Sequence, residues 1–416
     1  MQLSVRSCVC VAALVLAAPL ASRAQPGPGD VFREYLWTNP DGRASGMLRV
    51  GGRVGYGGGP IALPHQFDLA GAIRAELVIE KLLCHDGTRC LQISINDQAW
   101  LAVPEAPAIP EPAWDYQHQI YPIVPVPLDH LKADASNQFR MKVSDAHPWA
   151  WPQNLIYGVH VRIYYDPARK PHPTGQLVSP AAAAALETQV ELAAEASSPN
   201  GRIRQVDFLG DYEDVNLEGD GAYSQWHYHY VRAVLTGHLG SVTAAPWKLT
   251  WDTSWVPDQP RPPRLAARIT DETGLTSFTA AVDGLTLNRD GRSVELCKPY
   301  EVPKKWVTRS GEKAERFRIT GDLSQAVAAQ LVWVSWSPGY MDGLYLNDQR
   351  VFDREGPRYA YYVHRVPLQD LSVLRPGENV LKTGLTPKHN GQMVHGMEVN
   401  WPGIMVLIQY LPRRKT

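Results

Sequence analysis

Hydrophobic and polar residues alternate in short stretches along most of this 416-residue chain. Clear examples are LQISIN at 91–96, FRMKV at 139–143 and VLIQY at 406–410. A period of two residues is typical of β-strands that bury one face, and turn signals such as RPGEN at 375–379 separate these stretches. The pattern therefore predicts an all-β protein.

One segment, AAAAALETQVELAAEASS at 181–198, favours a helix by residue propensity alone. Within it, however, Val190, Leu192, Ala194 and Ala196 alternate with polar or small residues as a strand requires. We therefore predict a strand here, with AAAAAL forming a loop or a short helical turn.

The chain also contains two similar segments, and matching residues in the two copies are 240 to 254 positions apart. DLAGAIRAELV, starting at Asp68, matches DLSQAVAAQLV, starting at Asp322. The same order of matches continues in both copies, which predicts an internal duplication: Asn96-Asp97-Gln98 with Asn347-Asp348-Gln349, Val126-Pro127-Leu128 with Val366-Pro367-Leu368, Asn137 with Asn379, and Trp151-Pro152 with Trp401-Pro402.

The second copy, with LYLNDQRVF, VPLQDL and RPGENVLKTG, resembles galactose-binding-like jelly-roll modules. The first copy departs from that pattern, because ADASNQFRMKV replaces the Pro-Gly-Glu-Asn turn. The resemblance implies two jelly-roll β-sandwiches and no particular ligand.

The middle of the chain resembles bacterial immunoglobulin-like modules, in GQLVSP and VELAAEA and in WDTSWVPD followed by AARITDETG. The Pro-rich segment DPARKPHPTG and the polar segment NRDGRS are typical of boundaries. We therefore expect a jelly-roll-like domain at 25–166, an immunoglobulin-like β-sandwich at 175–288 and a second jelly-roll-like domain at 289–416.

The N-terminus predicts export. Arg6 precedes an apolar run, Val9 to Leu20, and Ser22-Arg23-Ala24 offers small residues for cleavage, so residues 1–24 read as a signal peptide. No stretch is long enough to insert in a membrane. We expect a secreted protein, extracellular or periplasmic.

Two cysteines, Cys84 and Cys90, flank the turn HDGTR between strand-like runs. In an oxidising compartment this predicts a local disulfide. A metal pair helped by His85 is the alternative, although the spacing is wider than in zinc knuckles.

Composition and motifs exclude several classes of function. The net charge is −1 and there are no basic runs, so we expect no nucleic-acid partner. The sequence contains no G-x-S-x-G, no Gly-rich phosphate loop after a strand and no H-E-x-x-H. No cofactor is predicted to be required.

The stretch GDYEDVNLEGDGAYSQWHYHY at 210–230 is the most acidic part of the chain and is predicted to be an inter-strand loop. A structural calcium ion is the alternative, bound by Asp214, Asn216, Glu218 and Asp220, because their spacing approaches that of calcium loops. Gln225 stands where such loops carry a bidentate Glu. His227 and His229 share a face of the following strand and are more typical of packed or exposed histidines than of a metal pair.

The candidate site residues lie mainly in the C-terminal copy. Glu398 with Asp342 or Asp353 could supply the two carboxylates of a glycoside hydrolase. The candidate ligand-binding residues are Trp149, Trp151, Trp401, Tyr340, His395 and Asn400. The sequence thus leaves three functions open: carbohydrate binding as the first, glycan degradation as the second, and structural surface assembly as the third.

Overall fold

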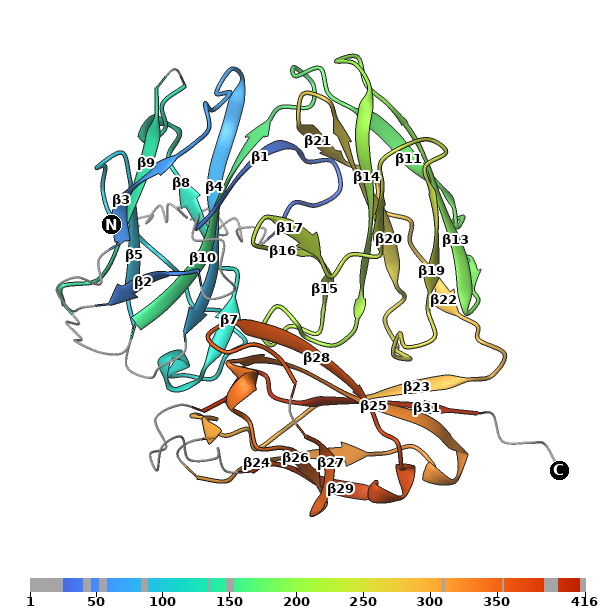
Figure 1. The fold of residues 1–416 in the computed structure, drawn as a ribbon. Coiled ribbons are helices and arrows are strands. Elements are labelled where there is room, and N and C mark those ends of the chain that lie inside the picture. The colour runs from blue at the N-terminus through green and yellow to red at the C-terminus, as the bar shows by residue number, and fades with distance from the viewer. Residues whose placement is uncertain are drawn as a thin grey trace, which may run out of the picture.

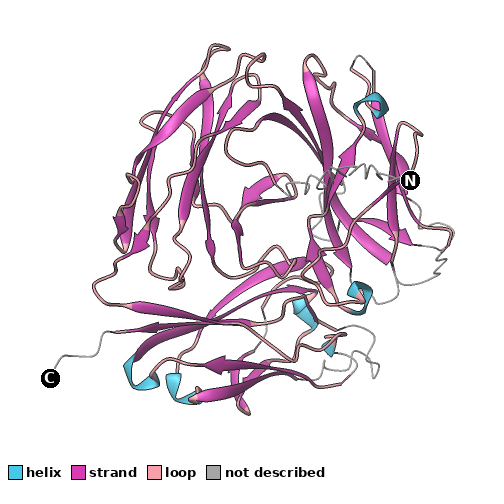
Figure 2. Ribbon diagram, turned by 180° about the vertical axis from the view of Figure 1, so that it is seen from behind, coloured by secondary structure: helices cyan, strands magenta, loops and turns pink. Residues whose placement is uncertain are grey.

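The computed structural model describes residues 25–39, 46–51, 58–83, 89–133, 135–146, 153–308, 311–353, 355–384 and 396–411. Strands dominate this part of the chain, and its helices are short 3-10 turns: η1 (Ala113–Asp115), η2 (Leu128–His130), η4 (Leu323–Gln325), η5 (Pro338–Tyr340) and η6 (Leu371–Val373) (Figure 2). The predicted all-β fold is confirmed. No helix in the described residues is long and apolar enough to cross a membrane.

The strands form three β-sandwiches, each around its own hydrophobic core (Figure 1). The N-terminal sandwich contains β1 (Val31–Thr38), β2 (Leu48–Gly51), β3 (Gly58–Leu63), β4 (Ala72–Leu83), β5 (Leu91–Ile95), β6 (Leu101–Ala102), β7 (His118–Ile120), β8 (Ile123–Val126), β9 (Asn137–Val143) and β10 (Gln153–Tyr165). The middle sandwich contains β11 (Thr174–Ser179), β12 (Ala185–Leu186), β13 (Gln189–Ser197), β14 (Ile203–Glu213), β15 (Ser224–Trp226), β16 (His229–Val231), β17 (Val234–Thr236), β18 (Gly240–Val242), β19 (Lys248–Asp252), β20 (Arg264–Asp271), β21 (Leu275–Phe278) and β22 (Thr286–Leu287). The C-terminal sandwich contains β23 (Ser293–Cys297), β24 (Lys313–Ile319), β25 (Ala326–Trp336), β26 (Leu344–Leu346), β27 (Gln349–Phe352), β28 (Tyr361–Pro367), β29 (Gly377–Thr383), β30 (Glu398–Val399) and β31 (Met405–Tyr410).

One sheet runs through both the N-terminal and the middle sandwich. Strand β1 pairs with β10 on one side and with β21 on the other, so eleven strands form a single sheet. Its main path is β15-β14-β20-β21-β1-β10-β4-β7. In Figure 1 this sheet forms an arch, and the β16–β17 hairpin lies inside it.

The two end sandwiches share a strand order. In the N-terminal one β10 lies between β1 and β4, and β9 lies between β3 and β5; in the C-terminal one β31 lies between β23 and β25, and β29 lies between β24 and β26. A hydrogen-bonded pair of asparagines occupies the same place in both. Asn96 Nδ2 donates to Asn137 Oδ1 at 2.8 Å, and Asn347 Nδ2 donates to Asn379 Oδ1 at 2.7 Å.

The segment at 189–197 is a strand, β13, although its composition favours a helix. Val190 and Leu192 are buried, while Gln189 and Glu191 are exposed. The strand pairs with β11 and β19, so tertiary pairing outweighs helix propensity here, as the alternation predicts.

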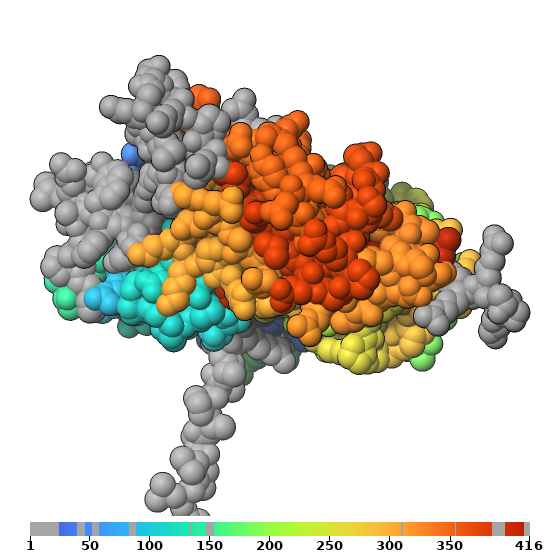
Figure 3. Space-filling view, turned by 90° about the horizontal axis from the view of Figure 1, so that it is seen from below, coloured from blue at the N-terminus to red at the C-terminus, as the bar shows by residue number. Residues whose placement is uncertain are grey.

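The C-terminal sandwich closes the open side of the arch, against both other sandwiches (Figures 1 and 3). The loop at 214–223 is wedged into this junction. Its Val215 packs in an apolar cluster with Val332 and Met405 of the C-terminal sandwich. At its tip, Gly219 has a φ of +72°, and a Cβ atom there would lie 1.7 Å from the carbonyl oxygen of Gln119. The close approach to the N-terminal sandwich therefore requires glycine.

Candidate functional site

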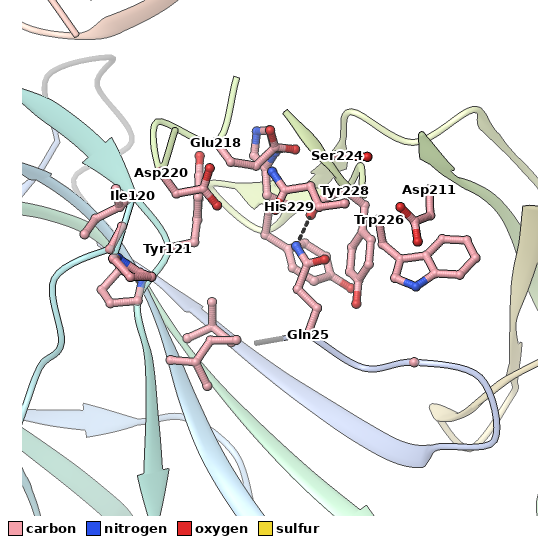
Figure 4. A pocket seen from close by; sticks show the side chains of 18 of the residues that line it. Gln25, Ile120, Tyr121, Asp211, Glu218, Asp220, Ser224, Trp226, Tyr228 and His229 are labelled. Atoms are coloured by element: carbon pink, nitrogen blue, oxygen red, sulfur yellow. Dashed lines mark hydrogen bonds and ion pairs between the residues drawn. The ribbon is translucent and has the colours of Figure 1, made fainter. Parts of the chain in front are cut away.

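A pocket with a volume of about 750 Å³ lies between the N-terminal and middle sandwiches. We call it the inter-sandwich pocket. Its N-terminal wall comes from the chain before β1, from residues 104–107 and from 120–123; its other wall comes from the 214–223 loop, β15, β16 and the start of β20. Figure 4 shows Gln25 reaching toward Tyr228, where its side-chain amide donates to the backbone carbonyl oxygen of Tyr228 at 3.3 Å.

One end of the pocket combines an indole ring with planar charged groups. Trp226 lines the pocket, and the guanidinium of Arg264 lies 5.5 Å from its ring centroid. Arg261 donates to Asp211 Oδ2 at 2.6 Å, and Arg264 Nε donates to the same oxygen at 3.1 Å. An aromatic face beside fixed donors and acceptors offers both an apolar surface and hydrogen bonds to one ligand.

The N-terminal wall carries an ionised carboxylate, Glu105. Lys81 Nζ lies 3.0 Å from its Oε1, and His118 Nε2 lies 3.2 Å from its Oε2. Burial alone would raise the pKa of Glu105, but attraction to Lys81 and the hydrogen bond with His118 outweigh burial and hold the pKa well below its usual range. This wall therefore presents a fixed negative charge.

The opposite wall carries Glu218, which is turned toward two histidines. Its Oε1 lies 3.7 Å from His227 Nδ1 and 3.5 Å from His229 Nδ1. Burial would lower the pKa of His227, but the nearby carboxylate of Glu218 raises it to about 9. The same contacts outweigh burial at Glu218 and lower its pKa. Both histidine side chains are therefore buried beside Glu218.

Asp220 has the opposite pKa shift in the same pocket. Burial, together with the charge of Glu218, raises the pKa of Asp220. Its Oδ1 accepts from Asn216 Nδ2 at 2.6 Å and from the backbone N–H of Ala222 at 2.9 Å. Carboxyl groups whose pKa values are pushed apart thus share one cavity.

The four predicted calcium ligands have other partners. Asn216 donates to Asp220 and to the Ala222 carbonyl oxygen, and Glu218 faces the histidines. Asp214 is half-buried near His227, and desolvation raises its pKa. In the described part of the chain, no group of three or more His, Cys, Asp or Glu side chains is arranged to hold a metal ion.

The three predicted catalytic carboxylates lie on two different sheets or their edges. Glu398 is 2% exposed in β30, which pairs with β25. Asp342 and Asp353 both lie beside Arg350 of β27, at 4.0 Å from Nη1 and 2.7 Å from Nε respectively. The structure brings the two aspartates to one arginine on the surface, with Glu398 buried in the sheet that packs on the other side of the core.

The predicted ligand-binding residues of the C-terminal sandwich face different surroundings. Trp401 packs edge-on against Tyr116 of the N-terminal sandwich, with ring centroids 4.9 Å apart. Asn400 is 1% exposed. Tyr340 contacts Arg358, whose guanidinium lies 4.7 Å from its ring centroid. Trp149, Trp151 and His395 lie outside the described residues.

The predicted disulfide also falls partly outside the described residues, because Cys84 is not among them. Cys90 is exposed, and Cys297 is a buried thiol in β23. The cysteine pairing stays a prediction.

Several residues that line the pocket or hold its lining residues in place escaped the sequence analysis. Lys81, with Glu80 before it, interrupts the apolar run ELVIEKLL, and such an interruption in a buried strand indicates buried partners. For Glu105 and Tyr121 no local pattern exists, since they form the pocket only together with middle-sandwich residues such as Asp211 and Glu218, roughly 100 positions later in the sequence.

No protein-family model matches the sequence, and no curated protein matches it closely. Among solved structures, a family 86 glycoside hydrolase in complex with neoagarooctaose aligns with a TM-score of 0.23 and 10% identity, over 59% of this chain and 35% of that chain. Fibronectin(III)-like modules of CbhA from Clostridium thermocellum align with a TM-score of 0.19 and 11% identity, over 49% of this chain and 79% of that chain. A DUF4785 family protein from Legionella pneumophila aligns with a TM-score of 0.23 and 10% identity, over 93% of this chain and 85% of that chain. The chain spans about a third of the length of the hydrolase, and matches this weak carry no argument about function.

Proposed function

We propose that the protein is a secreted carbohydrate-binding protein and that its ligand occupies the inter-sandwich pocket. The observation that carries the proposal is the pairing of Trp226 with the fixed group of Asp211, Arg261 and Arg264 in that pocket. A pyranose has apolar C–H faces and a rim of hydroxyls, so it matches a ring bordered by planar donors and acceptors. The volume of about 750 Å³ is in the range of ligand pockets.

The experiment is a glycan-array and polysaccharide pull-down screen, with soluble products analysed by chromatography. Trp226→Ala is expected to reduce retention of the bound glycan at least tenfold, which corresponds to about 1.4 kcal/mol. Trp100→Ala, an exposed tryptophan outside the pocket, is the matched control. Equal retention by the Trp226 variant and the control contradicts the proposal. If no glycan is retained and no product forms, structural surface assembly is favoured.

Glycan hydrolysis is the second candidate, because this pocket holds carboxylates with opposite pKa shifts. Asp220, with its raised pKa, is suited to act as an acid, and Glu105, which is held ionised beside Lys81, is suited to act as a nucleophile. Products in the screen that disappear with Asp220→Asn and Glu105→Gln support this candidate. If the products disappear with Glu398→Gln instead, the hydrolytic site lies in the C-terminal sandwich.

The finer architecture belongs to the same proposal: a signal peptide at 1–24, two duplicated jelly rolls at 25–166 and 289–416, and an immunoglobulin-like module at 175–288. The shared strand order and the paired asparagines of the end sandwiches support a duplication. In this proposal the modules act as a scaffold, and the ligand site arises where two of them meet.

A further inference from the structure

A second cavity, with a volume of about 410 Å³, lies on the same face of the eleven-stranded sheet as the inter-sandwich pocket. We call it the hairpin cavity. Its floor includes Glu34, Asp207, Arg268 and Thr270, and the β16–β17 hairpin forms one side. Tyr230 lines both cavities, so the hairpin separates two hollows over one polar surface.

The hairpin cavity contains a buried cation with unused donors. Arg268 is 2% exposed, and its Nη2 donates to Glu34 Oε2 and to Tyr230 Oη. Its Nε and Nη1 have no hydrogen-bond partner among the described residues. Leaving charged donors unsatisfied in a buried place costs several kcal/mol in general, so an acceptor in the cavity would be bound favourably.

The charges of the lining point to the class of that acceptor. The cavity has two arginines, Arg204 and Arg268, and two carboxylates, Glu34 and Asp207. An anion beside Arg268 would also face both carboxylates, and this repulsion offsets the attraction. A hydroxyl both donates and accepts, so it satisfies arginine and carboxylate together.

The rest of the lining supplies matching groups. Thr270 and Thr276 hydroxyls lie 2.9 Å apart, and Gln205 donates to Asp207 Oδ1 at 2.5 Å. Ser241 donates to the same Asp207 oxygen at 2.6 Å. Side-chain amides, hydroxyls and ion pairs that share hydrogen bonds form a surface for a polar, uncharged ligand.

We propose that the hairpin cavity is a second binding site, for an uncharged polyhydroxy ligand such as a neutral sugar unit. The ligand class rests on the proposed carbohydrate function, and the site itself rests on Arg268 and the balanced charges. Two sites flanking one hairpin suit a protein that contacts two units of the same glycan or two separate glycans.

The test uses saturation-transfer NMR and calorimetric titration of the purified protein with galactose, glucose, mannose and xylose, and in parallel with galacturonate and sulfate. The blocking variant is Val234→Trp, because Val234 lines the cavity and is 63% exposed. The matched control is Val178→Trp, which adds the same ring at an exposed position on β11. Gln205→Ala is a second variant that removes a donor without adding bulk.

We expect a neutral sugar to bind the unaltered protein. Its affinity should fall at least tenfold with Val234→Trp and should also fall with Gln205→Ala. It should be unchanged with Val178→Trp and with Trp226→Ala. Sugar binding that only Trp226→Ala removes overturns this inference and leaves the proposed function standing. Binding of sulfate or galacturonate alone, sensitive to Val234→Trp, overturns the ligand class. If none of these sugars binds the unaltered protein, this inference fails, and the glycan screen decides the proposed function separately.

Discussion

The phenol of Tyr361 donates a hydrogen bond to Oε1 of Glu80, which links the C-terminal sandwich to the N-terminal one. The other oxygen of the carboxylate, Oε2, accepts from the backbone N–H of Arg232 at 2.9 Å, at the tip of the β16–β17 hairpin. Glu80 is fully buried. One side chain therefore contacts all three sandwiches.

This carboxyl group predicts a pH-dependent stability. Burial raises the pKa of Glu80 to about 7, against the hydrogen bonds from Tyr361 and Arg232 and the charges of Arg232 and His229. Because the folded pKa lies above the unfolded value of 4.5, folding favours the protonated form. The contribution of this carboxyl group to the free energy of unfolding is fully present below pH 4.5 and is lost as the pH rises through 7.

Glu80→Gln, which keeps the shape without the charge, is expected to stabilise the protein relative to wild type more at pH 8 than at pH 5, by about 2 kcal/mol. Denaturant unfolding of the variant and the wild type at both pH values measures this difference in the free energy of unfolding. Glu187→Gln, at an exposed position, is the control. An equal effect at both pH values contradicts the shifted pKa.

The contacts of Glu218 with His227 and His229 make a second prediction, in which the substitution destabilises the protein. The raised pKa of His227 gives stability that is present below pH 6.5 and lost through about pH 9, and the lowered pKa of Glu218 gives stability that is lost in acid. Glu218→Gln is expected to cost about 3 kcal/mol at pH 6 and less at pH 10, since it leaves a buried cation without its partner.

Asp220→Asn is the matched control for Glu218→Gln, two residues along the same loop. Because burial raises the pKa of Asp220, a neutral amide is expected to be tolerated. The two variants are compared by thermal unfolding across pH. Similar losses at both positions would mean that the loop, and not the ion pair, is the source of stability.

The asparagine pairs of the end sandwiches predict equal effects in two distant places. Asn137 accepts from the backbone N–H of Lys132, and Asn379 accepts from that of Arg375, each at 2.9 Å, in addition to their asparagine partners. Asn137→Ala and Asn379→Ala are each expected to cost about 3 kcal/mol, because they leave several buried groups unsatisfied. Gln138→Ala, one position along, is expected to cost less than about 0.5 kcal/mol.

The all-β class and the strand at 189–197 were predictable from the sequence because alternation is a local signal, and a strand buries one face wherever it pairs. The residue matches around Asn96 and Asn347 likewise reflect local turn chemistry, since Asn96, Asp97, Asn347 and Asp348 all have positive φ angles. The sequence could not reveal that β1 pairs with β21, because that pairing joins positions about 240 residues apart. The inter-sandwich pocket depends on this pairing, so its residues were not predictable as a group.

The loop at 214–223 allows a direct test of calcium binding. The oxygens of this loop already have partners within the protein. We therefore expect the same unfolding midpoint in 5 mM calcium chloride as in EDTA. This calcium concentration exceeds the dissociation constants of extracellular calcium modules, which are roughly 0.1–1 mM. A midpoint that rises with calcium, and no longer rises in Asp220→Asn, would instead identify a metal site formed by rearrangement of the loop.

Trp401 makes the last prediction, about how the sandwiches hold together. Its ring packs on Tyr116, and its backbone N–H donates to the carbonyl oxygen of Gln117 at 2.8 Å. A Cβ atom at Gly221 would lie 2.9 Å from its Nε1, so the indole contacts the middle sandwich as well. Trp401→Ala is expected to weaken this junction by about 3 kcal/mol, and the C-terminal sandwich should then unfold in a separate, earlier transition. Calorimetry measures this against Trp100→Ala, which removes an equal ring from the surface. One cooperative transition at an unchanged midpoint would mean that Trp401 is free for the ligand contact that its sequence position suggests.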